Sequence, residues 1–140
     1  MVILDTNVLS VLMKEEADPC VQAWLNRQPV LSIWTTTVTI YEIQLGIELL
    51  PMGRRRQTLE LSFRKLLMQA INQQILAFDN VAAEYAAALD AYRHKSGRQI
   101  DSRDTFIAGI VLAQRATLAT RNVKHFADFN ISLVNPWAKN

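Results

Sequence analysis

Residues 2–7 read Val-Ile-Leu-Asp-Thr-Asn, an apolar run followed by one acid and two short polar residues. Three branched apolar residues in a row are typical of a strand that is buried on both faces. Asp5 stands at the carboxyl end of that strand, and Thr6 and Asn7 can cap a helix that follows at once. The stretch therefore indicates a parallel α/β sheet, in which ligands bind beyond the carboxyl ends of the strands.

The rest of the chain repeats this alternation of short apolar runs and longer helical patterns. Strands are expected at 2–4, 30–35, 75–78, 117–120 and 131–134, and helices at 6–13, 19–27, 39–50, 54–73, 81–94 and 101–115, with a helical turn at 122–126. Each expected strand is too apolar to face water. The pattern predicts a single domain over residues 1–140, with a central parallel sheet covered by helices on both sides.

The composition excludes several functional classes. With 50% hydrophobic residues, a chain of 140 residues can bury one core and needs no second domain. Cys20 is the only cysteine, which rules out an internal disulfide and a cysteine-rich zinc site and favours a reducing cytoplasm. We expect neither a leader nor a membrane anchor, because no apolar run approaches the roughly 20 residues that a bilayer requires. The sequence has no glycine-rich phosphate loop and no nucleophile-elbow motif.

The net charge of +2 hides an asymmetry between the two parts of the chain. Residues 1–50 carry two basic and six acidic side chains, whereas residues 51–140 carry thirteen basic and seven acidic ones. The basic side chains include two groups: Arg54, Arg55 and Arg56, and then Arg93 and Arg98. Such groups are candidates for binding the phosphates of RNA. Solvated helix ends explain either group equally well when it is taken alone.

Four acids fall where apolar elements begin or end: Asp5, Glu42, Asp101 and Asp104. A carboxylate beside a packed core loses hydration worth several kcal/mol unless a cation or hydrogen-bond donors replace it. Asp5 alone could be a helix cap, and Asp101 is interpreted as the cap of the helix that carries Asp104. Gathered together, such carboxylates most simply share a Mg²⁺ or Mn²⁺ ion.

Glu42 also has a structural interpretation. It stands three residues after Thr39, which matches a capping box, so its side chain could accept the backbone N–H of Thr39. Against this, the helix is apolar on nearly all sides, with Leu45 and Leu49 on the side of Glu42, so we expect a buried helix with Glu42 inside. Asp104 shares a helix face with apolar residues and is expected to point toward the core.

These residues, together with Asp104-Thr105-Phe106-Ile107-Ala108 and Thr120-Arg121-Asn122, resemble a PIN-domain ribonuclease, and more closely a VapC-type toxin of a type II toxin–antitoxin system. The resemblance covers essentially the whole chain in the right order. It implies a three-layer sandwich with a parallel sheet of about five strands and a Mg²⁺- or Mn²⁺-dependent endoribonuclease that uses a metal-activated water. It also implies a homodimer, with further assembly open, and a small cognate antitoxin through which DNA would be bound indirectly.

Carried over to this chain, the family's metal-binding and catalytic acids correspond to Asp5, Glu42 and Asp104. The fourth acidic position of many PIN domains falls at Asn122, which carries no charge, so a second ion should bind weakly. Asp101 is a further candidate that could supply part of the missing charge. The polar side chains that resemble those holding the acids and the attacking water in place are Thr6, Asn7 and Thr120.

Two other functions stay open from the residues alone. A strand-end aspartate can accept a phosphoryl group, which would make Asp5 the nucleophile of a phosphatase, although the common pattern has a second aspartate where this chain has Asn7. The domain could instead be a catalytically weak module that dimerises and binds an antitoxin or another partner through its acids. The amphipathic helix at 54–73 likewise fits either the domain's own core or a partner helix.

Overall fold

A five-stranded parallel sheet forms the centre of the computed structural model, which describes residues 1–98 and 101–138. Its strands are β1 (Val2–Leu4), β2 (Ile33–Thr36), β3 (Ile75–Leu76), β4 (Thr117–Ala119) and β5 (Ser132–Val134), in the spatial order β3-β2-β1-β4-β5. All four strand pairs are parallel. β1 lies in the middle because Val2 pairs with Ile33 on one side and with Thr117 on the other. The predicted parallel sheet is therefore confirmed.

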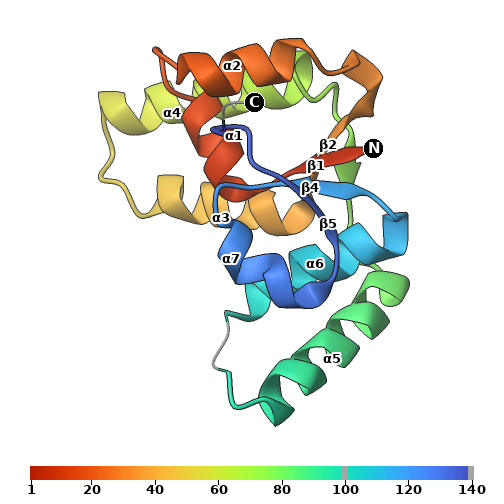
Figure 1. Cartoon of the computed structure of the whole chain (residues 1–140). Coiled ribbons are helices and arrows are strands. Elements are labelled where there is room, and N and C mark those ends of the chain that lie inside the picture. Colours follow the sequence, from red (N-terminus) through yellow and green to blue (C-terminus); the bar gives the residue numbers. More distant parts are fainter. Residues whose placement is uncertain (99–100, 139–140) are drawn as a thin grey trace.

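Helices cover both faces of the sheet (Figure 1). They are α1 (Thr6–Leu12), α2 (Pro19–Asn26), α3 (Thr37–Glu48), α4 (Arg54–Gln69), α5 (Asn80–Lys95), α6 (Ser102–Gln114) and α7 (Val123–Phe126), with 3₁₀ turns at Val30–Ser32 and Ala127–Phe129. Figure 1 shows α2 and α4 on one side of the sheet and α5 and α6 on the other. Across residues 1–98 and 101–138, no helix combines the length and the apolarity that crossing a membrane would require.

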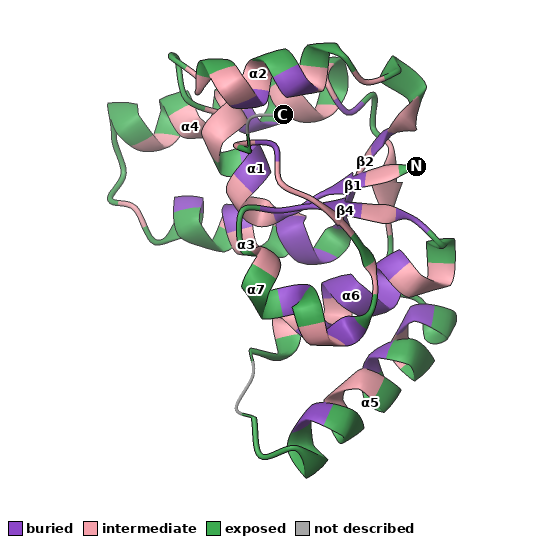
Figure 2. Ribbon diagram, in the orientation of Figure 1, coloured by how far each residue is buried: buried purple, intermediate pink, exposed green. Residues whose placement is uncertain are grey.

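Each face of the sheet has its own core. Ile3 packs with α6 and α7 through residues such as Ile107 and Phe126, whereas Leu4 packs with α1 and α2 through residues such as Val8 and Trp24. Neighbouring strand residues point to opposite faces, so β1 contributes to both cores. Buried residues follow the strands and the inner sides of the helices (Figure 2). This is the three-layer sandwich that the sequence predicts.

Helix boundaries differ from the predicted ones where a backbone signal intervenes. α3 begins at Thr37 rather than Thr39, because the hydroxyl of Thr36 accepts the backbone N–H of Thr39 at 3.1 Å and caps the helix there. α4 ends at Gln69, before two residues of the predicted helix that have positive φ angles, 57° at Asn72 and 58° at Gln73. The predicted strand at 30–35 starts with the 3₁₀ turn and becomes extended only at Ile33.

The expectation that α3 is buried all round is wrong. Ile43 and Ile47 are buried, but Tyr41, Leu45 and Leu49 are exposed to solvent. These three exposed residues recur at intervals of four, so they form one outward stripe of the helix. Only one side of α3 therefore belongs to the core.

A glycine permits the close packing of α5 on α6. A Cβ atom placed on Gly109 would lie 2.5 Å from the carbonyl oxygen of Ala82 and 3.0 Å from the Cβ of Ala86. The same pair of helices is joined by a hydrogen bond of 2.8 Å from the hydroxyl of Thr105, which is fully buried, to Asp90. α6 is held firmly as a result, and its first turn carries Asp104.

Candidate active site

Asp5 connects the sheet to the candidate site. It follows β1 and caps α1, with Oδ1 accepting the backbone N–H of Thr6 at 2.8 Å. Its Oδ2 accepts the hydroxyl of Thr120 at 2.8 Å and the side-chain amide of Asn7 at 3.3 Å. Asp5 is only 4% exposed, and burial is the main cause that raises the pKa of its carboxyl, with the charge of Asp104 acting in the same direction. The hydrogen bonds oppose that rise.

The three supporting polar residues predicted from the sequence all lie beside Asp5. The hydroxyl of Thr120 also accepts the backbone N–H of Asn122 at 3.0 Å, and the amide oxygen of Asn7 accepts the backbone N–H of Arg121 at 3.1 Å. The loop after β4 is thereby fastened to the loop after β1. The two loops lie side by side because β1 and β4 pair in parallel, so their carboxyl ends meet at one edge of the sheet.

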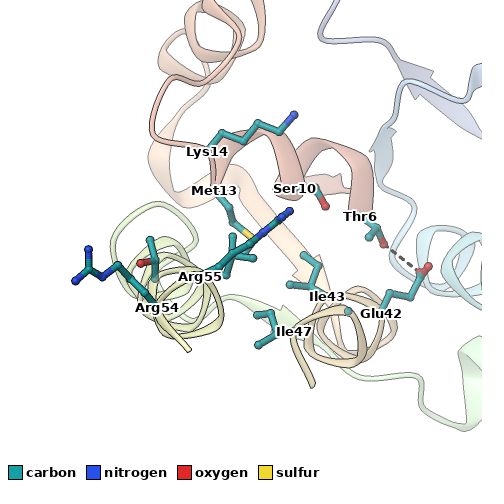
Figure 3. A pocket seen from close by; sticks show the side chains of 12 residues that line it. Thr6, Ser10, Met13, Lys14, Glu42, Ile43, Ile47, Arg54 and Arg55 are labelled. Carbon is teal, nitrogen blue, oxygen red and sulfur yellow. Dashed lines mark hydrogen bonds between the residues drawn. The ribbon is translucent and has the colours of Figure 1, made fainter. Parts of the chain in front are cut away.

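Glu42 points from α3 toward the start of α1. The hydroxyl of Thr6 donates a hydrogen bond of 3.0 Å to Glu42 Oε1, as the dashed line in Figure 3 shows. The capping-box interpretation of Glu42 is wrong, because Thr36 caps α3 instead. Burial raises the pKa of the Glu42 carboxyl, the hydrogen bond from Thr6 lowers it, and the charge of Asp5 raises it again.

Asp104 lies in the first turn of α6, with its side chain partly exposed. Burial raises the pKa of its carboxyl and the charge of Asp101 adds to the rise, whereas His125, whose Nδ1 is 3.7 Å from Asp104 Oδ2, lowers it. Asp101 caps α6, as predicted, and accepts the backbone N–H of Arg103 at 2.9 Å. It also accepts the Arg103 guanidinium at 3.1 Å, and this hydrogen bonding lowers the pKa of Asp101.

Comparison with known proteins identifies the family. The model of the PIN domain family matches residues 2–130. The chain belongs to the PIN domain family.

Relatives and solved structures match this PIN domain along nearly its whole length. It is 33% identical over 137 residues to the plasmid stability protein StbB of Pseudomonas syringae pv. tomato, covering 98% of this chain and 99% of that relative. It is 32% identical over 137 residues to the VapC ribonuclease Y4jK of Sinorhizobium fredii, covering 98% of each. The crystal structure of FitAcB from Neisseria gonorrhoeae superposes with a TM-score of 0.88 at 28% identity, covering 99% of this chain and 100% of that one.

The acids of this PIN domain repel one another. Asp5 and Asp104 each raise the pKa of Glu42, and Asp104 raises that of Asp5. Within residues 1–98 and 101–138, no three His, Cys, Asp or Glu side chains are close enough, as they stand, to share one metal ion. The donors themselves fit a hard cation, because all are carboxylate oxygens. Asp5 is fixed by three hydrogen bonds, so Glu42 and Asp104 are the side chains that would turn toward such an ion.

Two further side chains near the acids, Arg103 and His125, were not predicted from the sequence. Arg103 opposes the rise in the Glu42 pKa, and His125 lies beside Asp104. The position of Arg103 directly before Asp104 was a usable signal, since both fall in the first turn of one helix. His125 gave no signal, because its place depends on how α7 folds over α6. Asn122, where the resemblance places the fourth acid of many PIN domains, is an exposed residue directly before α7.

Arg93 does not belong to a surface for RNA, so that prediction is wrong. It is 2% exposed, and its Nε and Nη2 donate to the two carboxylate oxygens of Asp128, each at 3.0 Å. Its guanidinium also donates to the carbonyl of His125 and lies 3.5 Å from the centre of the Phe129 ring. Arg98 is half-exposed but also pairs with Asp128, at 3.0 Å. This basic group mainly joins the end of α5 to the segment after α7.

The other basic group divides between two roles. Arg56 pairs with Glu48 at 2.8 Å and donates to the carbonyl of Leu50 at 3.3 Å, so it satisfies the carboxyl end of α3. Arg54 and Arg55 are exposed and line a cavity of about 790 Å³ between α1, α3 and α4.

This cavity is called the α4 groove below, and Figure 3 shows its lining. Glu42 and Thr6 lie at one end, Arg54 lies at the other, and Ile43 and Ile47 form part of the wall between them. The α4 groove thus leads from the candidate acids to a basic edge along a largely apolar surface. The amphipathic helix predicted at 54–73 could serve the core or a partner, and α4 has a side for each. It packs on the core through Phe63, and another side of it lines the groove.

Proposed function

We propose that this PIN domain is a metal-dependent endoribonuclease that acts as the toxin of a toxin–antitoxin pair. The observation that carries the proposal is the gathering of Asp5, Glu42 and Asp104: the charges of Asp5 and Asp104 raise the pKa of Glu42, and the charge of Asp104 raises the pKa of Asp5. Asp5 is buried, yet every side chain or backbone group that donates to it is neutral. Such carboxylates keep their charge most easily when a cation binds among them. The Sinorhizobium relative, named a VapC ribonuclease, supports the same activity.

Asp5, Glu42 and Asp104 would hold the ion, Mg²⁺ or Mn²⁺. When bound, such an ion lowers the pKa of a water and stabilises charge on the phosphate oxygens. Thr120 and Asn7 keep the carboxylate of Asp5 in one orientation, so its oxygens need not reorganise. Asn122 brings no charge to the fourth position, which supports one tightly bound ion rather than two.

The exposed basic residues beside the α4 groove would bind the RNA backbone. Arg54 and Arg55 project at its edge, and neither forms a salt bridge among the described side chains. Contacts of this kind give affinity that falls with salt and carry little sequence information. Arg98, which is half-exposed, is a weaker candidate because Asp128 already pairs with it.

The α4 groove also fits a segment of a cognate antitoxin. A partner with apolar side chains along the groove, a basic group facing Glu42 and acidic groups facing Arg54 would match its lining. We propose that DNA is bound only through this antitoxin. The toxin would work in the cytoplasm as a homodimer. The likeness to the Neisseria structure FitAcB, with a TM-score of 0.88, supports the fold on which this proposal rests.

The first test is cleavage of end-labelled transfer, ribosomal and messenger RNAs in Mg²⁺, in Mn²⁺ and in excess chelator. Discrete cuts are expected only with metal. Asp104→Asn should fold normally and cut at least about a hundredfold more slowly, which corresponds to a loss of about 3 kcal/mol of transition-state stabilisation. Glu84→Gln, which neutralises an exposed acid of α5, is the matched control and should cut at the normal rate.

Two results would contradict the proposal. Full activity of Asp104→Asn would remove Asp104 from the site. Intact RNA under every condition, together with no heat of Mn²⁺ binding in calorimetry, would favour the non-catalytic module. The phosphatase alternative gains nothing from the geometry, because Asp5 is buried and both of its carboxylate oxygens accept hydrogen bonds.

A further inference from the structure

His125, on α7, brings a nitrogen donor next to one of the three acids. Its Nδ1 lies 3.7 Å from Asp104 Oδ2, and its side chain is 64% exposed. A separation of 3.7 Å is too long for a hydrogen bond, so the two atoms approach each other without one. The imidazole is therefore an available donor beside a carboxylate that would hold a metal ion.

The backbone holds His125 firmly in this place. Its N–H donates to the carbonyl of Asn122 at 3.0 Å, and its carbonyl accepts from the guanidinium of Arg93, which is 2% exposed. The next residue, Phe126, is fully buried in the core that α6 and α7 share. α7 is thus anchored at His125, while the ring can still turn about its own bonds beside the first turn of α6.

The spacing between the two side chains is that of two ligands of one ion. Oxygen and nitrogen ligands lie about 2.0–2.2 Å from a divalent ion such as Mg²⁺ or Zn²⁺, so two of them lie about 3 Å apart at a right angle and about 4 Å apart when they are opposite. The 3.7 Å between Asp104 Oδ2 and His125 Nδ1 falls within that range without any movement. One ion could therefore bind both atoms at once.

A nitrogen ligand would change which ion the site prefers. Carboxylate oxygens suit Mg²⁺, whereas imidazole suits transition metals, and the affinity of a given site rises from Mn²⁺ to Co²⁺. Asn122 is uncharged, so the acids alone give the site three carboxylates. His125 would add a fourth side chain through its lone pair rather than through a negative charge.

We propose that His125 binds, through Nδ1, the ion that Asp104 shares with the other two acids, and that this nitrogen makes the site favour transition-metal ions over Mg²⁺. The inference rests on the proposed function and adds a metal preference to it. The rival role of His125 is an ion pair with Asp104, in which the imidazolium only offsets a negative charge. The two roles differ in whether a metal–nitrogen bond exists and in how the three ions Mg²⁺, Mn²⁺ and Co²⁺ are ranked.

Electron spin echo spectroscopy of Mn²⁺ bound to the protein tests the ligand directly, because a coordinated nitrogen modulates the echo. The chain has two histidines, so the assignment needs only two variants. His125→Ala should lose the modulation. His94→Ala, which removes the exposed histidine near the end of α5, is the matched control and should keep it. An unmodulated echo from Mn²⁺ bound to the native protein would overturn the inference.

Calorimetry with Mg²⁺, Mn²⁺ and Co²⁺ tests the preference. His125→Ala should weaken Co²⁺ binding at least about tenfold, a loss that metal sites show even when an indirect partner of the metal is removed. The loss should be smaller for Mn²⁺ and absent for Mg²⁺. His125→Asp should bind Mg²⁺ more tightly than the native protein does, because a further carboxylate suits a hard ion. Equal changes for all three ions in His125→Ala would assign the ion-pair role and overturn the inference.

Folding and cleavage are checked separately from metal binding. Because the His125 side chain is exposed, both of its variants should melt in chelator as the native protein does. If they do not fold, the echo of His94→Ala still decides, since His125 is then the only histidine. Metal-dependent RNA cleavage without nitrogen modulation would remove the inference and leave the nuclease. Nitrogen-bound Mn²⁺ in a protein that leaves RNA intact under every condition would keep the ligand and remove the nuclease.

Discussion

The hydroxyl of Thr120 donates a hydrogen bond of 2.8 Å to Oδ2 of Asp5, across 115 residues of sequence. The contact follows from the register of the sheet. Leu4 of β1 pairs with Ala119 of β4, so the residues that follow them, Asp5 and Thr120, lie side by side. The same hydroxyl accepts the backbone N–H of Asn122. One small side chain thus orients the most buried acid and holds the loop that follows β4.

Replacing Thr120 with valine should destabilise the protein and weaken its metal site. Valine keeps the shape but removes the donor, and a buried carboxylate that loses a hydrogen bond costs about 1–3 kcal/mol. The pKa of Asp5 should rise further, so Mn²⁺ affinity at neutral pH should fall. Denaturant unfolding and calorimetry measure the two effects. Thr117→Val, on β4, removes a hydrogen bond of 2.9 Å to the exposed hydroxyl of Ser132, so it should change stability little and Mn²⁺ affinity not at all. Equal behaviour of the two variants would refute the assigned role.

Asp5→Asn should gain stability relative to the native protein as pH rises, when both are kept in chelator. Burial raises the pKa of Asp5 above 3.8 in the folded state, so between 3.8 and that raised value the folded protein holds a proton that the unfolded chain has lost. Native stability from this group therefore falls with rising pH, and asparagine has no such slope. Thermal melts from pH 4 upward measure the difference, and a gap that is constant with pH would contradict it.

The fold and the main acids could be predicted because their signals are local. The run Val2-Ile3-Leu4 is typical of a buried strand, and an acid directly after such a strand lies where α/β proteins bind ligands. The parallel sheet then brings Asp5 and Thr120 to the same edge without any further information. Asp101 was likewise recognised as a helix cap from its place before a helical pattern.

The predictions that failed depended on contacts between distant elements. Arg93 looks in sequence like one member of a basic surface run, and only the packing of α5 on the segment after α7 buries it against Asp128. Glu42 has the spacing of a capping box, but Thr36 caps the helix, and the Glu42 carboxylate accepts a hydrogen bond from Thr6 instead. Helical spacing alone also could not tell that Leu49 faces solvent.

Replacing Arg93 alone should lower the free energy of unfolding strongly, whereas replacing Arg93 and Asp128 together should lower it much less. Arg93→Met leaves the largely buried charge of Asp128 with only its exposed partner, Arg98, which should cost about 3–5 kcal/mol of unfolding free energy. The double variant Arg93→Met with Asp128→Leu should recover most of that loss, because apolar side chains tolerate burial. Arg98→Met should cost at most about 1 kcal/mol. Urea unfolding of the four proteins measures these values.

The same pair gives a pH dependence of opposite sign to that of Asp5. Hydrogen bonding to Arg93 lowers the pKa of Asp128 below 3.8 in the folded state. The stability that ionised Asp128 contributes is complete above the pKa of an aspartate in the unfolded chain, about 3.9. It is lost as the pH falls through the lower pKa of Asp128 in the folded protein. The stability gap between the native protein and Arg93→Met should therefore narrow below about pH 3.9. A gap that widens there would show that Asp128 is not the charge that Arg93 neutralises.

Alanine should have opposite effects at two helical glycines. At Gly109 the new Cβ would stand 2.5 Å from the carbonyl oxygen of Ala82, so α5 and α6 must separate, which should cost about 1–3 kcal/mol. At Gly46, in α3, a Cβ meets no atom within 4 Å, and the gain in helix propensity should stabilise the protein by about 0.5–1 kcal/mol. Because α6 carries Asp104, Gly109→Ala should also reduce cleavage more than its stability loss explains, when rates are measured well below the melting temperature. Equal stability of the two variants would contradict the close packing of α5 on α6 at Gly109.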